Sequence, residues 1–189
     1  MPALPGGRPF VDDDAPIYPE AVEVLRQSRR DPDEGVRQGA AVRLHWFRWR
    51  EFGPALPELA GEALAWAQAE PVPRIQRSLL WSAPLLPAPG AAGWLVAQLA
   101  AGDRLTRRAA AARLAEAEPA LAADPLLQAA DSPDDELRWT ALEALAKLGE
   151  ARALPKFERE LAGGRLRGPA QRAALMAMYR RLKLLTGEG

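Results

Sequence analysis

One helix-forming pattern returns at near-constant intervals along this chain of 189 residues. It occurs in five segments, whose anchor residues are Val36, Ile75, Thr106, Leu137 and Ala170. Successive anchors are 39, 31, 31 and 33 residues apart, which leaves room for two short helices and their turns in each interval. Units of this size cannot bury an apolar face alone, so they stack and cover one another. The interval therefore predicts an all-α solenoid of about five helix pairs, with the anchors on the second helix of each pair.

The segment around the fourth anchor has the clearest helix boundaries. Ser132 can cap its first turn, Pro133 suits the first helical position, and Gly149 ends the apolar run. Between these boundaries the apolar residues recur at helical spacing, as Leu137, Ala141, Leu145 and Leu148. The segment predicts a helix over 132–149 with one face in the core.

The composition favours helix over strand along the whole chain. Only twelve residues are Val, Ile or Thr, whereas Ala, Leu, Arg and Glu are abundant. Helices are expected at residues 19–30, 32–50, 54–70, 72–83, 91–101, 103–117, 132–149, 151–162 and 169–185. The segment 119–130 contains Pro125 and is expected to form either one bent helix or two turns.

Residues 1–17 differ from the rest of the chain, because they contain four Pro, two Gly and the run Asp12-Asp13-Asp14. This composition predicts an extended N-terminal arm, followed by a repeat domain over 18–189. Three adjacent carboxylates can hold a cation, but a solvated acidic tail is the commoner outcome. We therefore predict no metal site here.

A short motif opens the second helix of three units. It reads Asp-x-x-(Val/Leu/Thr)-Arg-x-x-Ala and occurs at Asp33 to Ala40, Asp103 to Ala110 and Asp134 to Ala141. It resembles the HEAT-like repeats, in the short bacterial form of about thirty residues that is also called the PBS-lyase type. The resemblance implies a right-handed α-solenoid of about five HEAT-like helix pairs after residue 17. It also implies a non-catalytic adaptor or scaffold that binds a protein partner on its concave face.

The motif suggests a structural role for its two charged residues. An Asp in the first turn favours the positive end of the helix dipole, and the Arg four residues later lies one turn further on. If the units stack, each motif Arg can also reach the Asp of a neighbouring unit. We therefore expect a ladder of ion pairs that joins Asp103, Arg107, Asp134 and Arg138.

The residues two positions after the anchors form the first candidate binding site. They are Arg77, Arg108, Trp139 and Arg172, and the resemblance places the second helices on the concave wall. Three permanent cations around one indole would suit an acidic, partly apolar peptide of a protein partner. The alternative is a row of ordinary solvated arginines.

The segment 43–50 offers a second candidate, because it interleaves basic and aromatic residues. Arg43, Trp46 and Arg50 fall on one helical stripe, which could stack on bases or grip phosphates. The alternative is that Trp46 fills a gap in the least regular unit. The formal net charge of zero argues against nucleic acid, which we keep as a possible but less favoured partner.

Few residues of this chain could carry catalysis. There is no Cys and one histidine, His45, with no Ser near it in the sequence, so we predict no catalytic residue, metal or cofactor. The enzymatic alternative is an alkylpurine DNA glycosylase, a HEAT-like family with concave Trp and acidic residues. Trp139 and Glu143 lie one turn apart as such a site requires, but a second Trp–Asp pair is missing. A bilin-lyase-like activity has less support, because no chromophore-binding signature is found.

Composition also bears on the compartment. The first residues lack the apolar core of a signal peptide, and no window approaches eighteen uninterrupted apolar residues. Arg outnumbers Lys by 22 to 3 and Asn is absent, which is typical of a GC-rich bacterial genome. These features favour a soluble cytoplasmic protein with no membrane partner.

Overall fold

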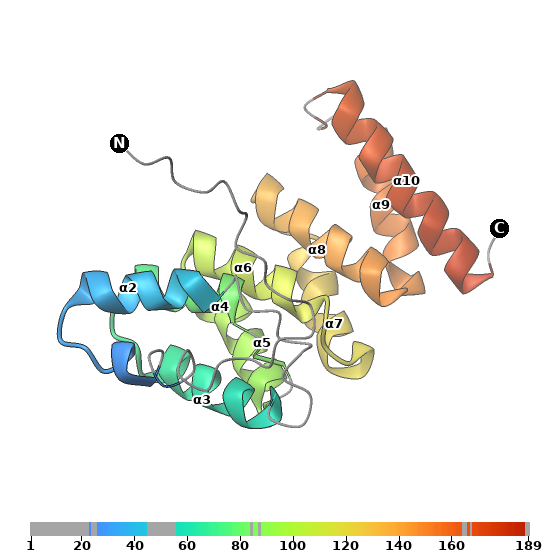
Figure 1. Ribbon diagram of the computed structural model, residues 1–189. Coiled ribbons are helices and arrows are strands. Elements are labelled where there is room, and N and C mark those ends of the chain that lie inside the picture. Colours follow the sequence, from blue (N-terminus) through green and yellow to red (C-terminus); the bar gives the residue numbers. More distant parts are fainter. Residues whose placement is uncertain are drawn as a thin grey trace, which may run out of the picture.

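The computed structural model describes residues 23, 26–44, 56–83, 85–86, 88–163, 166 and 168–187 (Figure 1). Within this part of the chain the secondary structure is helical, which confirms the all-α prediction. The helices are α2 (Glu34–Arg43), α3 (Leu56–Ala69), α4 (Pro73–Ser82), α5 (Ala91–Ala101), α6 (Arg104–Leu114), α7 (Pro119–Ala129), α8 (Asp135–Leu148), α9 (Leu154–Ala162) and α10 (Pro169–Thr186). A short 3-10 turn, η3 (Ala151–Ala153), precedes α9. The predicted arm over 1–17 and its boundary with the repeats lie outside the described residues.

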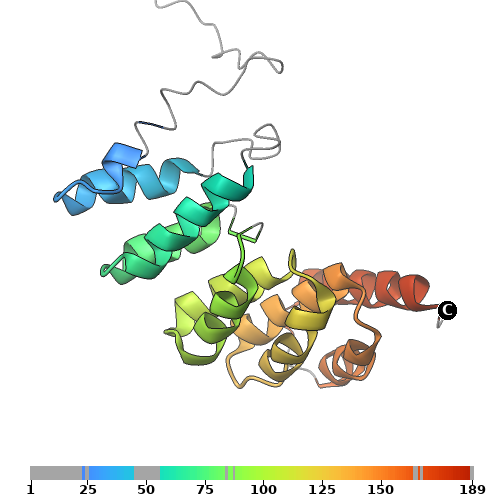
Figure 2. The ribbon, with the colours of Figure 1, turned by 90° about the horizontal axis from the view of Figure 1, so that it is seen from below.

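The helices form a solenoid in which successive units pack in sequence order. The second helices α2, α4, α6, α8 and α10 contact one another as consecutive neighbours. The first helices lie against them, since α3 packs on α4, α5 on α6, α7 on α8 and α9 on α10. The colours in Figures 1 and 2 follow this order from one end of the molecule to the other. The predicted α-solenoid is confirmed, with four described helix pairs after α2.

The anchors explain the core of the middle units. Ile75, Thr106 and Leu137 are buried, with 0%, 4% and 1% of their surface exposed. In the terminal units, by contrast, Val36 is 44% exposed and Ala170 is also exposed. Terminal units of a stack have only one neighbour, so their equivalent positions are covered less completely. The repeated pattern is therefore a core pattern only where a unit lies between two others.

The helix that contains the fourth anchor begins later than predicted. Asp134, and not Ser132, is the N-cap of α8, because its carboxylate accepts hydrogen bonds from the backbone N–H groups of Glu136 and Leu137. Ser132 is buried, and its Oγ accepts a hydrogen bond from the N–H of Asp134 at 3.2 Å. Gly149 ends the helix as predicted, in the left-handed conformation with φ of 72°.

The remaining boundaries mostly follow the expected ranges. The motif residues Asp33 and Asp103 cap α2 and α6 in the same way as the N-cap of α8. The segment with Pro125 forms one helix, α7, and not two turns. The predicted continuation of α2 over 45–50 lies outside the described residues.

Candidate functional site

The row two positions after the anchors lies on successive second helices. Arg77 is on α4, Arg108 on α6, Trp139 on α8 and Arg172 on α10. Because these helices pack in this order, the four residues follow the stack from one unit to the next. Two of them, Arg108 and Trp139, line a common hollow, whereas Arg77 and Arg172 lie outside its described lining.

This hollow has a volume of about 400 Å³ and lies beside α8. Its lining comes from α6, from the first half of α8, from α9, from Leu166 and from the first turn of α10. In Figure 1, α8 lies between α6 and α10, so the hollow is built by the second helices of three consecutive units. Among the described residues, the charged side chains that line it are Arg108, Asp135, Glu136, Arg138, Glu143 and Glu160. Four carboxylates and two guanidiniums give this described part of the lining a formal charge of −2.

Two arginines of the row are engaged by carboxylates of the following unit. Nη1 of Arg77 lies 2.8 Å from Oδ2 of Asp103, and Nη1 of Arg108 lies 2.5 Å from Oε2 of Glu136. Arg77 and Arg108 thus keep their permanent charge, but each already has a carboxylate partner within the chain. Each acid stands at the start of the next second helix, where it faces the preceding helix. Arg172 is exposed on α10, and the described residues give it no carboxylate partner.

The expected ladder between motif arginines and motif aspartates is wrong. Nε of Arg107 donates to the backbone carbonyl of Leu99 at 3.0 Å, and Nη1 of Arg138 donates to the carbonyl of Ser132 at 2.8 Å. These arginines thus turn back towards the end of the preceding first helix. They satisfy carbonyl groups that the end of a helix or a turn leaves unpaired.

The motif aspartates do pair with a neighbouring unit, but through other arginines. Oδ2 of Asp103 binds Arg77, and Oδ2 of Asp134 accepts from Nε of Arg104 at 2.7 Å. The backbone hydrogen bond from Thr106 contributes most to lowering the pKa of the Asp103 carboxyl. Neighbouring units are therefore joined by ion pairs, as predicted, although the arginines differ from those of the motif.

A buried arginine lies beneath the hollow. Arg138 is 5% exposed, and its guanidinium pairs with Asp135 and Glu160 at 2.7 Å each. Burial opposes its charged form, but the hydrogen bonds and charges of the two carboxylates outweigh burial and raise the pKa of Arg138. The base of the hollow is thus held by a fixed ionic network.

Trp139 and Glu143 present the groups of the hollow that remain open for a ligand. They lie one turn apart on α8, and both are half-buried. Within the described part of the chain, Glu143 has no hydrogen-bond or ion-pair partner, unlike the other five charged groups of the lining. Sequence reasoning brought Trp139 and Glu143 together but missed Glu160, which α9 contributes from a distant part of the sequence.

The comparison with protein families agrees with this geometry. The family model described as HEAT repeats matches residues 92–179, a stretch that runs from α5 into α10. Residues 92–179 are therefore similar to HEAT repeats. The resemblance inferred from the motif is confirmed, and the hollow lies within the matched stretch. A comparison with curated proteins found no match.

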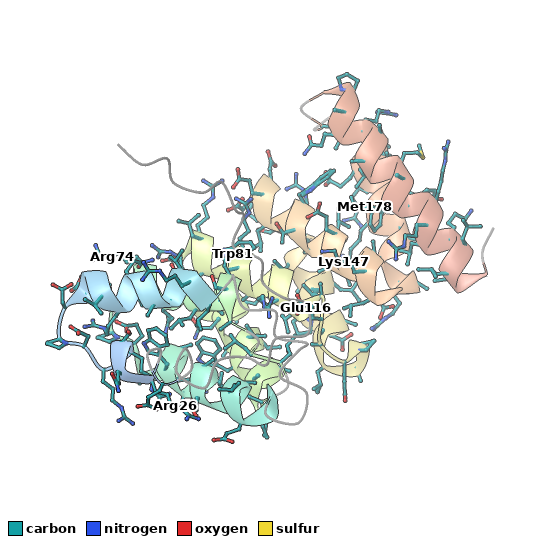
Figure 3. The ribbon with its side chains drawn as sticks, in the orientation of Figure 1. Arg26, Arg74, Trp81, Glu116, Lys147 and Met178 are labelled. Atoms are coloured by element: carbon teal, nitrogen blue, oxygen red, sulfur yellow. The ribbon has the colours of Figure 1, made fainter. Side chains whose placement is uncertain are left out.

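An exposed indole lies in the unit before this matched stretch. Trp81 of α4 is 47% exposed and lies one turn after Arg77 (labelled in Figure 3). It occupies the sixth position after its anchor, as does Val42 on α2, which is 46% exposed. This shared position is visible in the repeat alignment, so the sequence contained the signal for an exposed apolar pair on neighbouring helices.

The candidate nucleic-acid patch cannot be assembled from the described residues. Arg43 is exposed at the end of α2, whereas Trp46 and Arg50, like His45, lie outside the described residues. The nucleic-acid patch therefore stays a prediction.

The described residues contain no helix that combines the length and the apolar character needed to cross a membrane. They also contain no group of three or more His, Cys, Asp or Glu side chains arranged to hold a metal ion.

Proposed function

We propose that this chain is a non-catalytic HEAT-repeat adaptor that binds a protein partner on a concave face formed by its second helices. The observation that carries the proposal is the position of Trp139, half-buried in a hollow that three consecutive second helices build. Aromatic side chains in partly enclosed pockets are the commonest hot spots of protein interfaces. Arg77, Arg108 and Arg172 are proposed to flank this anchor.

The ion pairs of Arg77 and Arg108 define the role that we propose for this row. Arg77 and Arg108 are proposed to form a polar rim with their carboxylate partners. Arg172, which has no carboxylate partner among the described residues, is proposed to add a cation at one end. Trp81 extends the proposed surface towards α2 and α4. An interface with an aromatic centre and a polar rim is the usual anatomy of a protein–protein contact.

Charge argues against the alternative of a nucleic-acid-binding or alkylpurine glycosylase-like module. The described lining has a formal charge of −2, which repels a phosphate backbone, and the two guanidiniums among its described residues are already paired. The described residues thus supply no basic groove beside Trp139.

The experiment is a capture of partners from native cell extract, with and without nuclease. Trp139→Ala should reduce capture of the main partner at least about tenfold, as expected for a hot spot, and nuclease should have no effect. The matched control is Leu121→Ala, which removes an apolar side chain that is 54% exposed on α7, in the layer of first helices. Capture that nuclease abolishes, or that Trp139→Ala leaves intact, would contradict the proposal.

A further inference from the structure

We propose that the hollow beside Trp139 binds a basic side chain of the partner, and an arginine in particular. This inference rests on the proposed function and names the chemistry of the residue that the hollow receives. It replaces the acidic, partly apolar peptide expected from the sequence.

The first argument is charge. Of the two guanidiniums in the lining, Arg108 is paired with Glu136, and Arg138 is paired with Asp135 and Glu160. Glu143 is the carboxylate that remains without a counter-ion among the described residues of the lining. A bound cation would supply that counter-ion, whereas a carboxylate of an acidic peptide would face like charge.

The second argument is the spacing of Trp139 and Glu143. Residues four apart on a helix lie on one face, so the indole and the carboxylate border the same space. An indole ring attracts a cation over its face, and a carboxylate accepts two parallel hydrogen bonds from a guanidinium. Arginine can make both contacts with one planar group, whereas lysine offers a point charge. The arrangement therefore favours arginine.

The third argument is size and rigidity. A volume of about 400 Å³ lies at the small end of the range for ligand pockets, which suits one long side chain. The wall is held by the buried Arg138 and by the Thr140 hydroxyl, which donates to the carbonyl of Glu136 at 2.9 Å. A preformed wall lowers the entropic cost of binding.

The test starts from random peptides displayed on phage and selected against the full chain. Peptides that bind should be enriched in arginine. One binder is then synthesised in three forms, with arginine, with citrulline (nearly the same shape without the charge) and with glutamate at the enriched position. Fluorescence anisotropy measures the affinity of each form for wild type, Glu143→Gln and the control Glu118→Gln, which removes an exposed carboxylate at the start of α7.

For wild type and for Glu118→Gln, the citrulline peptide should bind at least about tenfold more weakly than the arginine peptide, since it lacks a charge-assisted contact. For Glu143→Gln, the difference in affinity between the arginine and citrulline peptides should shrink to about twofold or less, because the carboxylate that pairs with the arginine is gone. An equal loss on all three proteins would overturn the inference.

Variants of Trp139 separate failure of this inference from failure of the proposed function. Trp139→Phe, with Trp139→Ala as the stronger change, should weaken binding of the selected peptides while thermal melts confirm folding. Binders that depend on Trp139 but are enriched in Asp or Glu would overturn the inference and leave the proposed function intact. Binders that ignore Trp139, or a selection without binders, would count against both.

Discussion

The Nε atom of Arg138 on α8 lies 2.7 Å from Oε1 of Glu160 on α9, and the two side chains are 6% and 12% exposed. An equivalent pair joins Arg37 on α2 and Glu70 at the end of α3, with a distance of 3.2 Å. In both cases the motif arginine of a second helix meets a glutamate of the next first helix. Arg37 and Arg138 therefore connect consecutive units through these glutamates, whereas Arg107 binds the carbonyl of Leu99.

Removal of one member of the Arg138–Glu160 pair should be costly. Arg138→Ala would leave Glu160 buried without a counter-ion, which typically lowers the free energy of unfolding by about 3–5 kcal/mol. The control Arg74→Ala breaks an ion pair with Glu34 in which both side chains are more than half exposed, at 58% and 51%. Such a pair is worth under about 1 kcal/mol. Urea denaturation measures both, and equal losses would contradict the prediction.

Glu70 should make the stability of the protein depend on acidic pH. Burial raises the pKa of its carboxyl, but hydrogen bonds from Arg37, from the Trp66 indole and from the N–H of Val72 outweigh burial, so the pKa is lowered in the folded state. A lowered pKa in the folded state contributes stability above the unfolded value of about 4.3. This contribution is lost as the pH falls through the lower, folded-state pKa.

The measurement for Glu70 is the free energy of unfolding in urea at pH 7, 5, 4 and 3. Wild type should keep the contribution of Glu70 down to about pH 5 and lose it at the lower values. Glu70→Gln lacks this titration, so its stability should be lower at pH 7 and should change less between pH 5 and pH 3. Parallel curves for the two proteins would contradict the prediction.

Deletion of α10 should expose the core of the preceding unit. Leu175 and Leu182 are fully buried, whereas Leu184 and Leu185 are 77% and 60% exposed. Removal of residues 169–189 should therefore cause aggregation or strong binding of a hydrophobic dye, because a repeat is covered only by its neighbours. Removal of residues 184–189 serves as the control and should leave dye binding at the wild-type level. A soluble longer truncation without dye binding would show that α10 is dispensable.

The end of α8 depends on a left-handed glycine. Gly149 has φ of 72°, so Gly149→Ala should cost roughly 1–2 kcal/mol even though nothing crowds its Cβ position. The control Gly61→Ala lies within α3, also with open space, and should stabilise the protein by about 0.4–1 kcal/mol. Thermal melts should therefore shift in opposite directions, and shifts of the same sign would refute this account of the cap.

Local sequence features predicted the helices and their caps because each depends on only a few neighbouring residues. The spacing of Leu137, Ala141 and Leu145 defines a buried face, and a glycine in the left-handed conformation ends α8 as expected. The one local error concerns Ser132, which was expected to cap the helix. Two competing capping residues stood two positions apart, and Asp134 is the one that reaches the first turn.

The side-chain partners were harder to predict because they depend on the tilt and rotation of neighbouring helices. Arg107 was expected to reach an aspartate, yet it binds the carbonyl of Leu99. Glu160 lines the hollow together with Trp139 because η3 packs against α8 after the turn at Gly149, and α9 follows η3. The repeat spacing predicts which helices are neighbours, but not which of several arginines on a helix meets a given acid.

The carboxylates of Asp103 and Asp134 each divide their two oxygens between two tasks. In Asp103, Oδ1 accepts from the N–H of Thr106 and so caps α6, while Oδ2 binds Arg77 of the preceding unit. The start of a second helix and its contact with the previous unit are therefore thermodynamically linked through one side chain. In a linear array this strengthens the nearest-neighbour coupling relative to the stability of any single unit. The stack should accordingly melt as one cooperative block, and not unit by unit from its ends.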